Sequence, residues 1–174
     1  MSAGRAHLGL GSNLGDRRGQ LQAAVDGLAE RGVLAVASSS TYETDPVGDV
    51  LDQPQFLNAC LAVETELDAD ALLVACKDVE RALGRTTEGP GYVHHGPRPI
   101  DVDVLLAFGR EHASERLTVP HPGLLERRFV LIPLLEIDFS LATPGGVALA
   151  DALAALPVAE GVRREGAPLT LPAR

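Results

Sequence analysis

The chain has 174 residues, a length that fits one domain with its own core. Its net charge of −9 argues against broad binding to nucleic acid or to an anionic membrane, because both need a basic surface. No apolar run approaches the ~20 residues of a membrane helix, and the N-terminus lacks a signal-peptide pattern. Cys60 and Cys76 lie in apolar segments, which favours buried free thiols, and we expect a cytoplasmic protein.

The first part of the chain predicts a strand, a helix and a second strand. Residues 6–10 indicate a short buried strand that runs into a glycine turn. A helix follows, with Asp16 as its N-cap and Gly32 just past its end. Residues 34–42 predict one strand, and residues 44–55, which contain proline and glycine, predict an irregular loop.

The clearest strand pattern lies over residues 56–67, where apolar side chains alternate with more polar ones. Asp68 or Asp70 then begins a second helix, which Gly84 stops. A loop over residues 85–98 follows.

A further strand over residues 100–108 completes the order β-α-β-β-α-β. This order predicts an α+β fold with a ferredoxin-like core. We expect a single domain over residues 1–174, with additional C-terminal elements that include a helix near residues 148–156.

Asp101 and Asp103 form the sharpest local feature. Side chains two positions apart on a strand point the same way, with Cα atoms about 6.5–7 Å apart. The opposite face is expected to be buried and carries Ile100, Val102, Val104 and Leu106. Two carboxylates on one face repel each other unless a cation or a proton intervenes. Because Mg²⁺ takes one or two carboxylates together with substrate phosphates, the pair favours a magnesium site over a solvated acidic face.

The glycine turn invites comparison with a dinucleotide-binding fingerprint, but it does not match one. Gly9, Gly11 and Gly15 follow the first strand, and Leu14 stands where the third glycine should be. The only lysine is Lys77, so no phosphate-loop lysine is present. We therefore interpret this turn as structural.

Other polar and aromatic residues allow more than one interpretation. Four histidines match no zinc-ligand spacing, and no cysteine lies near them; they are His94, His95, His112 and His121. His121 suits either phosphate binding or loop packing. Phe56, Phe129 and Asn58 suit a flat heterocycle, although core packing by itself explains the aromatic residues better.

Five segments together resemble the 6-hydroxymethyl-7,8-dihydropterin pyrophosphokinases. They are residues 8–16, 39–48, 52–58, 96–103 and 117–131, in the order found in that family. The resemblance extends from about residue 6 to about residue 138, and it implies the same ferredoxin-like fold.

The resemblance implies an ATP-dependent diphosphotransferase of folate biosynthesis. The terminal pyrophosphoryl group of ATP would pass to the hydroxymethyl oxygen of a reduced pterin alcohol, and AMP would leave. The expected catalytic residues are Asp101, Asp103, Arg98 and Arg85, with Asp101 and Asp103 holding two Mg²⁺ ions. The expected ATP-binding residues are Lys77, Glu80, Arg85, Arg98, Arg116, Thr118, His121 and Arg127. The expected pterin-binding residues are Thr44, Asp45, Val47, Phe56, Asn58, Asp101 and Phe129.

The loop over residues 86–95 departs from the family pattern. It contains Glu88 but no arginine or lysine, and it places His94 and His95 where the family commonly has arginine and tryptophan. Because histidine loses its charge near neutral pH, we expect ATP affinity to depend on pH more than in relatives. Two rival functions remain: a degenerate relative that binds without turnover, and a metal-dependent phosphohydrolase, which would not need the aromatic pair.

Overall fold

The computed structural model describes residues 2–158 and 161–173 and is built around one antiparallel sheet. The strands of this sheet are β1 (Gly4–Ser12), β2 (Val33–Ser38), β3 (Thr41–Thr44), β4 (Phe56–Thr65), β5 (Asp101–Ala107) and β8 (Val162–Gly166). Their order is β5-β1-β4-β3-β8, and β2 also pairs with β4. β6 (His112–Ala113) and β7 (Thr118–Val119) form a separate hairpin. The predicted α+β, ferredoxin-like core is confirmed.

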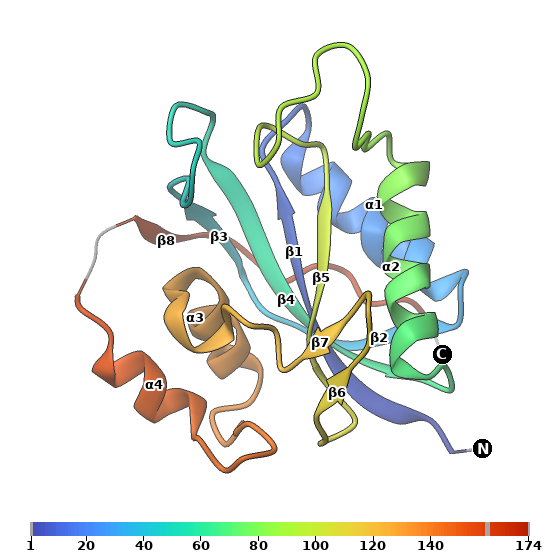
Figure 1. The fold of residues 1–174 in the computed structure, drawn as a ribbon, viewed down its shortest axis with the longest axis vertical. Helices are drawn as coiled ribbons and strands as arrows, with labels where there is room; N and C mark the ends of the chain where they lie inside the picture. Colours follow the sequence, from blue (N-terminus) through green and yellow to red (C-terminus); the bar gives the residue numbers. More distant parts are fainter. Residues whose placement is uncertain (1, 159–160, 174) are drawn as a thin grey trace.

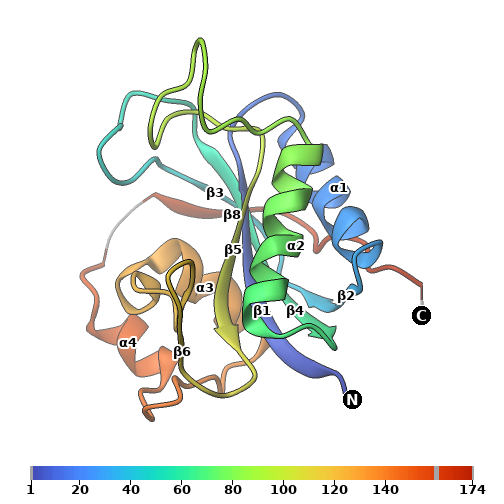
Figure 2. The same cartoon turned by 45° about the vertical axis from the view of Figure 1, so that its right-hand side comes forward.

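Helices cover both faces of the sheet (Figures 1 and 2). α1 (Arg17–Ala29) and α2 (Ala69–Ala82) lie on one face, and α3 (Arg128–Ile137) and α4 (Leu149–Ala155) lie on the other. Each face has its own apolar core, with Leu8, Leu61 and Val102 in the first and Leu105, Leu131 and Leu149 in the second. In the part of the chain that the structure describes, no helix is long and apolar enough to cross a membrane.

The first two helices begin where the sequence predicts. The carboxylate of Asp16 accepts a hydrogen bond from Gly19 N (3.0 Å), and that of Asp68, rather than Asp70, accepts one from Ala71 N (2.8 Å). Each bond satisfies a donor that the first helical turn leaves free.

The prediction of a single strand over residues 34–42 is wrong, because this segment does not form one continuous strand. It is two strands, β2 and β3, separated by the fully buried Ser39 and Ser40. At this break the hydroxyl of Ser39 accepts from Cys60 N (2.9 Å), and Ser39 N donates to Cys60 O (2.9 Å). A serine hydroxyl that competes for backbone groups interrupts the regular ladder there.

Two further expectations need correction or extension. Leu106 packs in the second core instead of beside Val102 and Val104, because the β1–β5 pairing shifts register between His7 and Leu8. The helix α3, the 3₁₀ turn Leu124–Glu126 and the strand β8 were not predicted at all.

Glu136 fixes α3 against the break between β2 and β3. Its carboxylate accepts hydrogen bonds from Ser40 N (3.0 Å), Ser40 Oγ (2.5 Å) and Tyr42 Oη (2.6 Å). Partial burial acts to raise the pKa of Glu136, but these hydrogen bonds outweigh it and hold the pKa below the ordinary value of a glutamate.

We predict that Glu136→Gln lowers the free energy of unfolding at pH 7 by on the order of 1 kcal/mol, since water competes at this exposed carboxylate. A lowered pKa stabilises the fold above the ordinary glutamate value of 4.5 and ceases to do so as the pH falls through the folded-state value. The difference between wild type and variant should therefore shrink in acid. Urea unfolding from pH 7 to pH 3 measures it, and a constant difference would contradict the prediction.

Candidate active site

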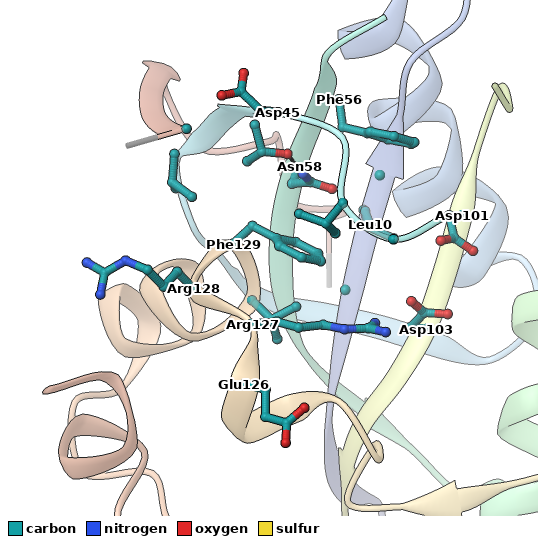
Figure 3. A pocket seen from close by; sticks show the side chains of 18 of the residues that line it. Leu10, Asp45, Phe56, Asn58, Asp101, Asp103, Glu126, Arg127, Arg128 and Phe129 are labelled. Atoms are coloured by element: carbon teal, nitrogen blue, oxygen red, sulfur yellow. Dashed lines mark hydrogen bonds between the residues drawn. The ribbon is translucent and has the colours of Figure 1, made fainter. Parts of the chain in front are cut away.

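A pocket of about 620 Å³ is lined by residues of the sheet, of α3 and of the loops over residues 45–55 and 86–98. Both loops lie at the upper end of the sheet in Figure 1. The pocket brings together all seven residues predicted for the pterin: Thr44, Asp45, Val47, Phe56, Asn58, Asp101 and Phe129. Asp103, Arg98 and Arg127 line the same pocket. Figure 3 shows the aromatic rings of Phe56 and Phe129 facing the space beside the two carboxylates of β5.

The floor of the pocket is made by the glycines of β1. Gly11 pairs with Asp101 and Gly9 with Asp103, and both glycines line the pocket. A Cβ atom at Gly11 would lie 2.6 Å from Asn58 Oδ1, so a side chain there would displace that amide. Gly9 and Gly11 therefore line the pocket without placing a side chain in it, and the structural interpretation of the turn stays a prediction.

The two carboxylates differ in their surroundings. Asp101 Oδ1 lies 2.6 Å from Arg85 Nη1, and Asp101 Oδ2 lies 3.5 Å from Arg98 Nη2. Burial would raise the pKa of Asp101, but the charges of these arginines hold it below its ordinary value.

Asp103 forms no ion pair with any residue that the structure describes. Burial and the neighbouring charge of Asp101 raise its pKa to about 7. The arginine charges therefore favour the ionised form of Asp101, whereas burial and the charge of Asp101 favour the protonated form of Asp103.

Glu80, on α2, organises the arginine side of the site. Its buried carboxylate accepts from Arg85 Nη1 (3.0 Å), Lys77 Nζ (3.1 Å) and Val102 N (2.8 Å). Burial raises the pKa of Glu80 against the opposing charge of Lys77. Because it bonds both Arg85 and the backbone between the two aspartates, Glu80 links α2 to the carboxylate pair.

The structure divides the predicted ATP-binding residues into three groups. Arg98 and Arg127 line the large pocket. Lys77, Glu80 and Arg85 line a second cavity of about 320 Å³. Arg116, Thr118 and His121 line neither.

The members of this third group lie on or beside the β6–β7 hairpin. Arg116 and Thr118 are exposed there. His121 holds a turn, since its Nδ1 accepts from Gly123 N (3.0 Å), and burial followed by the charge of Arg127 lowers its pKa.

An arginine guanidinium lies near each of the two aromatic rings of the pocket. The guanidinium of Arg98 lies 4.8 Å from the ring centre of Phe56, and that of Arg127 lies 5.9 Å from that of Phe129. Between the rings in the view of Figure 3, Asn58 donates through Nδ2 to Thr44 Oγ1. One amide and two aromatic faces thus border the same space.

Asn13 was not singled out from the sequence, although it lies in the segment 8–16 that carries the resemblance. Its buried Nδ2 donates to Gln53 Oε1 and to Pro54 O (both 3.0 Å), and its Oδ1 accepts from Arg98 N (2.8 Å). One side chain therefore joins both loops that border the pocket.

Of the two atypical histidines, His95 lines the pocket and His94 does not. His95 Nδ1 lies 3.0 Å from Asp49 Oδ2, and Gln53 Nε2 donates to His95 O (3.1 Å). His94 Nδ1 lies 3.2 Å from the hydroxyl of Tyr92. The histidine loop thus contacts the loop over residues 45–55, and its predicted role toward ATP stays a prediction.

Residues 7–139 match the family model described as 7,8-dihydro-6-hydroxymethylpterin-pyrophosphokinase (HPPK). The chain belongs to this family. It is 48% identical over 153 residues to the 2-amino-4-hydroxy-6-hydroxymethyldihydropteridine pyrophosphokinase of Methylorubrum extorquens, covering 87% of this chain and 93% of that protein. The enzyme of the same name from Pseudomonas aeruginosa is 40% identical over 164 residues, covering 92% of this chain and 96% of that protein.

Solved structures share the fold. HPPK-DHPS of Plasmodium falciparum with pterin and p-hydroxybenzoate matches with a TM-score of 0.66 at 16% identity, over 88% of this chain. This chain spans less than half of that protein, 42% of its length.

We predict that Asn13→Ala raises KM for both substrates several-fold and lowers stability by about 2–3 kcal/mol, because buried partners on both loops lose their bonds. Asn13→Asp keeps the acceptor for Arg98 N but not the donors to Gln53 and Pro54. Asn13→Asp should therefore raise KM for the substrate that binds beside the loop over residues 45–55 more than it raises KM for the other substrate. Steady-state kinetics with urea unfolding measures both effects, and unchanged KM values in Asn13→Ala would contradict the prediction.

Proposed function

We propose that this chain transfers the terminal pyrophosphoryl group of ATP to the hydroxymethyl oxygen of 6-hydroxymethyl-7,8-dihydropterin, with release of AMP, in folate synthesis. The observation that carries the proposal is a single pocket in which an aromatic pair and a carboxylate pair border the same space, in a chain of this family. ATP and the reduced pterin alcohol are its substrates.

The pterin ring lies between Phe56 and Phe129, where two apolar faces favour a flat heterocycle. Asn58 and Thr44 supply an amide and a hydroxyl for the polar edge of the ring. This orientation directs the hydroxymethyl group toward Asp101, at the opposite side of the pocket in Figure 3.

The carboxylate pair fits Mg²⁺. No group of three or more histidine, cysteine, aspartate or glutamate side chains suited to a metal occurs within residues 2–158 and 161–173, but Mg²⁺ needs only one or two carboxylates when phosphates supply further oxygens. Among the described residues Asp103 has no ion-pair partner, and Gly9 and Gly11, which pair with the two aspartates, carry no side chain, so this part of the pocket leaves room for a cation. Asp101 and Asp103 would hold two Mg²⁺ ions, which supply positive charge to the triphosphate when bound.

The reaction depends on alignment and charge neutralisation. A bond forms between the hydroxymethyl oxygen and the β-phosphorus, the bond from that phosphorus to the oxygen of AMP breaks, and the hydroxyl proton passes to solvent. Arg98 and Arg127 face the pocket and bind phosphate oxygens, while Arg85 reaches Asp101 from the second cavity.

We also assign roles to the remaining residues predicted for ATP. Lys77 and Glu80 border the second cavity beside Arg85, and the carboxylate of Glu80 accepts from both cations and so holds the arginine toward the phosphates. Arg116, Thr118 and His121 lie on the adjoining hairpin and turn, where they bind the nucleotide outside the large pocket.

The direct test incubates the protein with ATP, Mg²⁺ and the reduced pterin alcohol. AMP should form only when all three are present. ADP or inorganic phosphate as the product would favour the rival phosphohydrolase, and binding without any product would favour the degenerate relative.

We predict that Asp103→Ala lowers kcat by several orders of magnitude while the fold stays intact, because the carboxylate acts through the metal at the pocket surface. Glu66→Ala removes an exposed acid outside both cavities and is the matched control. AMP release and thermal unfolding are measured for both. Retention of more than a tenth of wild-type activity by Asp103→Ala would overturn the metal assignment.

We predict that Phe129→Ala weakens pterin binding about tenfold, because an aromatic face contributes on the order of 1–1.5 kcal/mol. ATP affinity should stay nearly unchanged. Phe139→Ala is the control, since Phe139 is 73% exposed and lies outside the pocket. Titration calorimetry with each substrate measures the effect, and equal losses for both ligands would indicate that Phe129 acts through packing.

A further inference from the structure

Part of the pocket wall comes from a segment beyond the family match. The match ends at residue 139, yet Leu156, Pro157, Gly161 and Val162 also line the pocket. Val162 is the first residue of β8, the outermost strand of the sheet beside β3, and Gly161 directly precedes it. The C-terminal strand thus borders the side of the pocket that carries Thr44 and Asp45.

Strand β8 and the residue before it contact the backbone of Thr44 and Asp45 directly. Val162 pairs with Thr44, and Gly161 O accepts a hydrogen bond from Asp45 N (2.9 Å). Gly161 has φ +109°, and a Cβ atom there would lie 2.7 Å from Asp45 Oδ2. Only glycine allows this close approach without displacing the aspartate.

Arg163 adds a charged contact on the same side. Its Nη2 lies 3.5 Å from Asp45 Oδ1 and 3.6 Å from Glu43 Oε1. Gln55 Nε2 donates to the same oxygen of Asp45 (2.8 Å). The carboxylate of Asp45 is therefore held between the C-terminal strand and the loop over residues 45–55.

The pairing of β8 with β3 also covers the backbone edge of β3. Without β8, β3 would be an edge strand with unpaired backbone groups. Thr44, the last residue of β3, bonds Asn58 inside the pocket, so the position of β3 affects the polar end of the site.

We propose that the start of β8 is a positioning element for the polar end of the pterin site, with Gly161 and Arg163 as its positioning residues. The inference rests on the proposed function, because it takes the reduced pterin alcohol as the ligand of this pocket. The C-terminal strand acts through Thr44 and Asp45 and does not touch the reacting atoms.

The experiment compares Arg163→Ala with Arg164→Ala. Arg164 has the same charge and lies on the same strand, but it pairs with Tyr42 and forms no ion pair with Asp45 or Glu43. Because ion pairs of exposed arginines are weak, Arg163→Ala should raise KM for the pterin alcohol only about threefold to tenfold, with kcat and KM for ATP within about twofold. Arg164→Ala should leave all three unchanged, and Arg163→Lys should recover part of the loss.

Gly161→Ala should raise KM for the pterin more than Arg163→Ala, since it displaces Asp45 directly. Thermal unfolding shows whether each variant folds. If Gly161→Ala does not fold, the comparison of Arg163→Ala with Arg164→Ala alone tests the proposal. An unchanged pterin KM in Arg163→Ala, or equal changes in both arginine variants, would overturn the proposal.

Calorimetry with the pterin alcohol separates this proposal from the proposed function. If the wild type binds the pterin but forms no AMP, the proposed function fails, and a weaker Kd in Arg163→Ala than in Arg164→Ala still supports the role of β8. If the wild type does not bind the pterin, both proposals fail.

Discussion

The repulsion between Asp101 and Asp103 is the constraint on which the rest of the site depends. Two carboxylates two residues apart on β5 must share one face of the sheet. Arg85 and Arg98 neutralise the first, while the pKa of the second rises to about 7. The glycines of β1 leave the space in front of them open. The fold thus holds negative charge that a bound cation would balance, and the cation would in turn bind the triphosphate.

The site also depends on segments that are distant in sequence being held together. Asn13 joins the two loops at the pocket rim, and Glu80 joins α2 to β5. Both side chains are buried, so their hydrogen bonds compete little with water and fix the positions of their partners. The geometry of the candidate site therefore also rests on buried side chains that do not line the large pocket.

Local patterns predicted most of the core elements. The alternation over residues 56–67 and the capping residues Asp16 and Asp68 are short-range signals, and the structure contains the strand and both helices. The break at Ser39 was missed because it depends on bonds to Cys60, on a strand that follows some twenty residues later. Strand β8 was missed because its sequence has little apolar alternation, and it is a strand only by virtue of pairing with β3.

The sequence by itself determined the family, the α+β core and the residues expected at the pterin and the metal, because these depend on motifs and on short-range periodicity. Only the tertiary structure decided that the seven predicted pterin residues line one pocket and that the predicted ATP residues divide among three places. It also decided that Gly9 and Gly11 form the floor and that β8 forms a wall. The reason is physical: strand pairing and burial bring together residues that are far apart in the chain, and no local pattern records which neighbours they acquire.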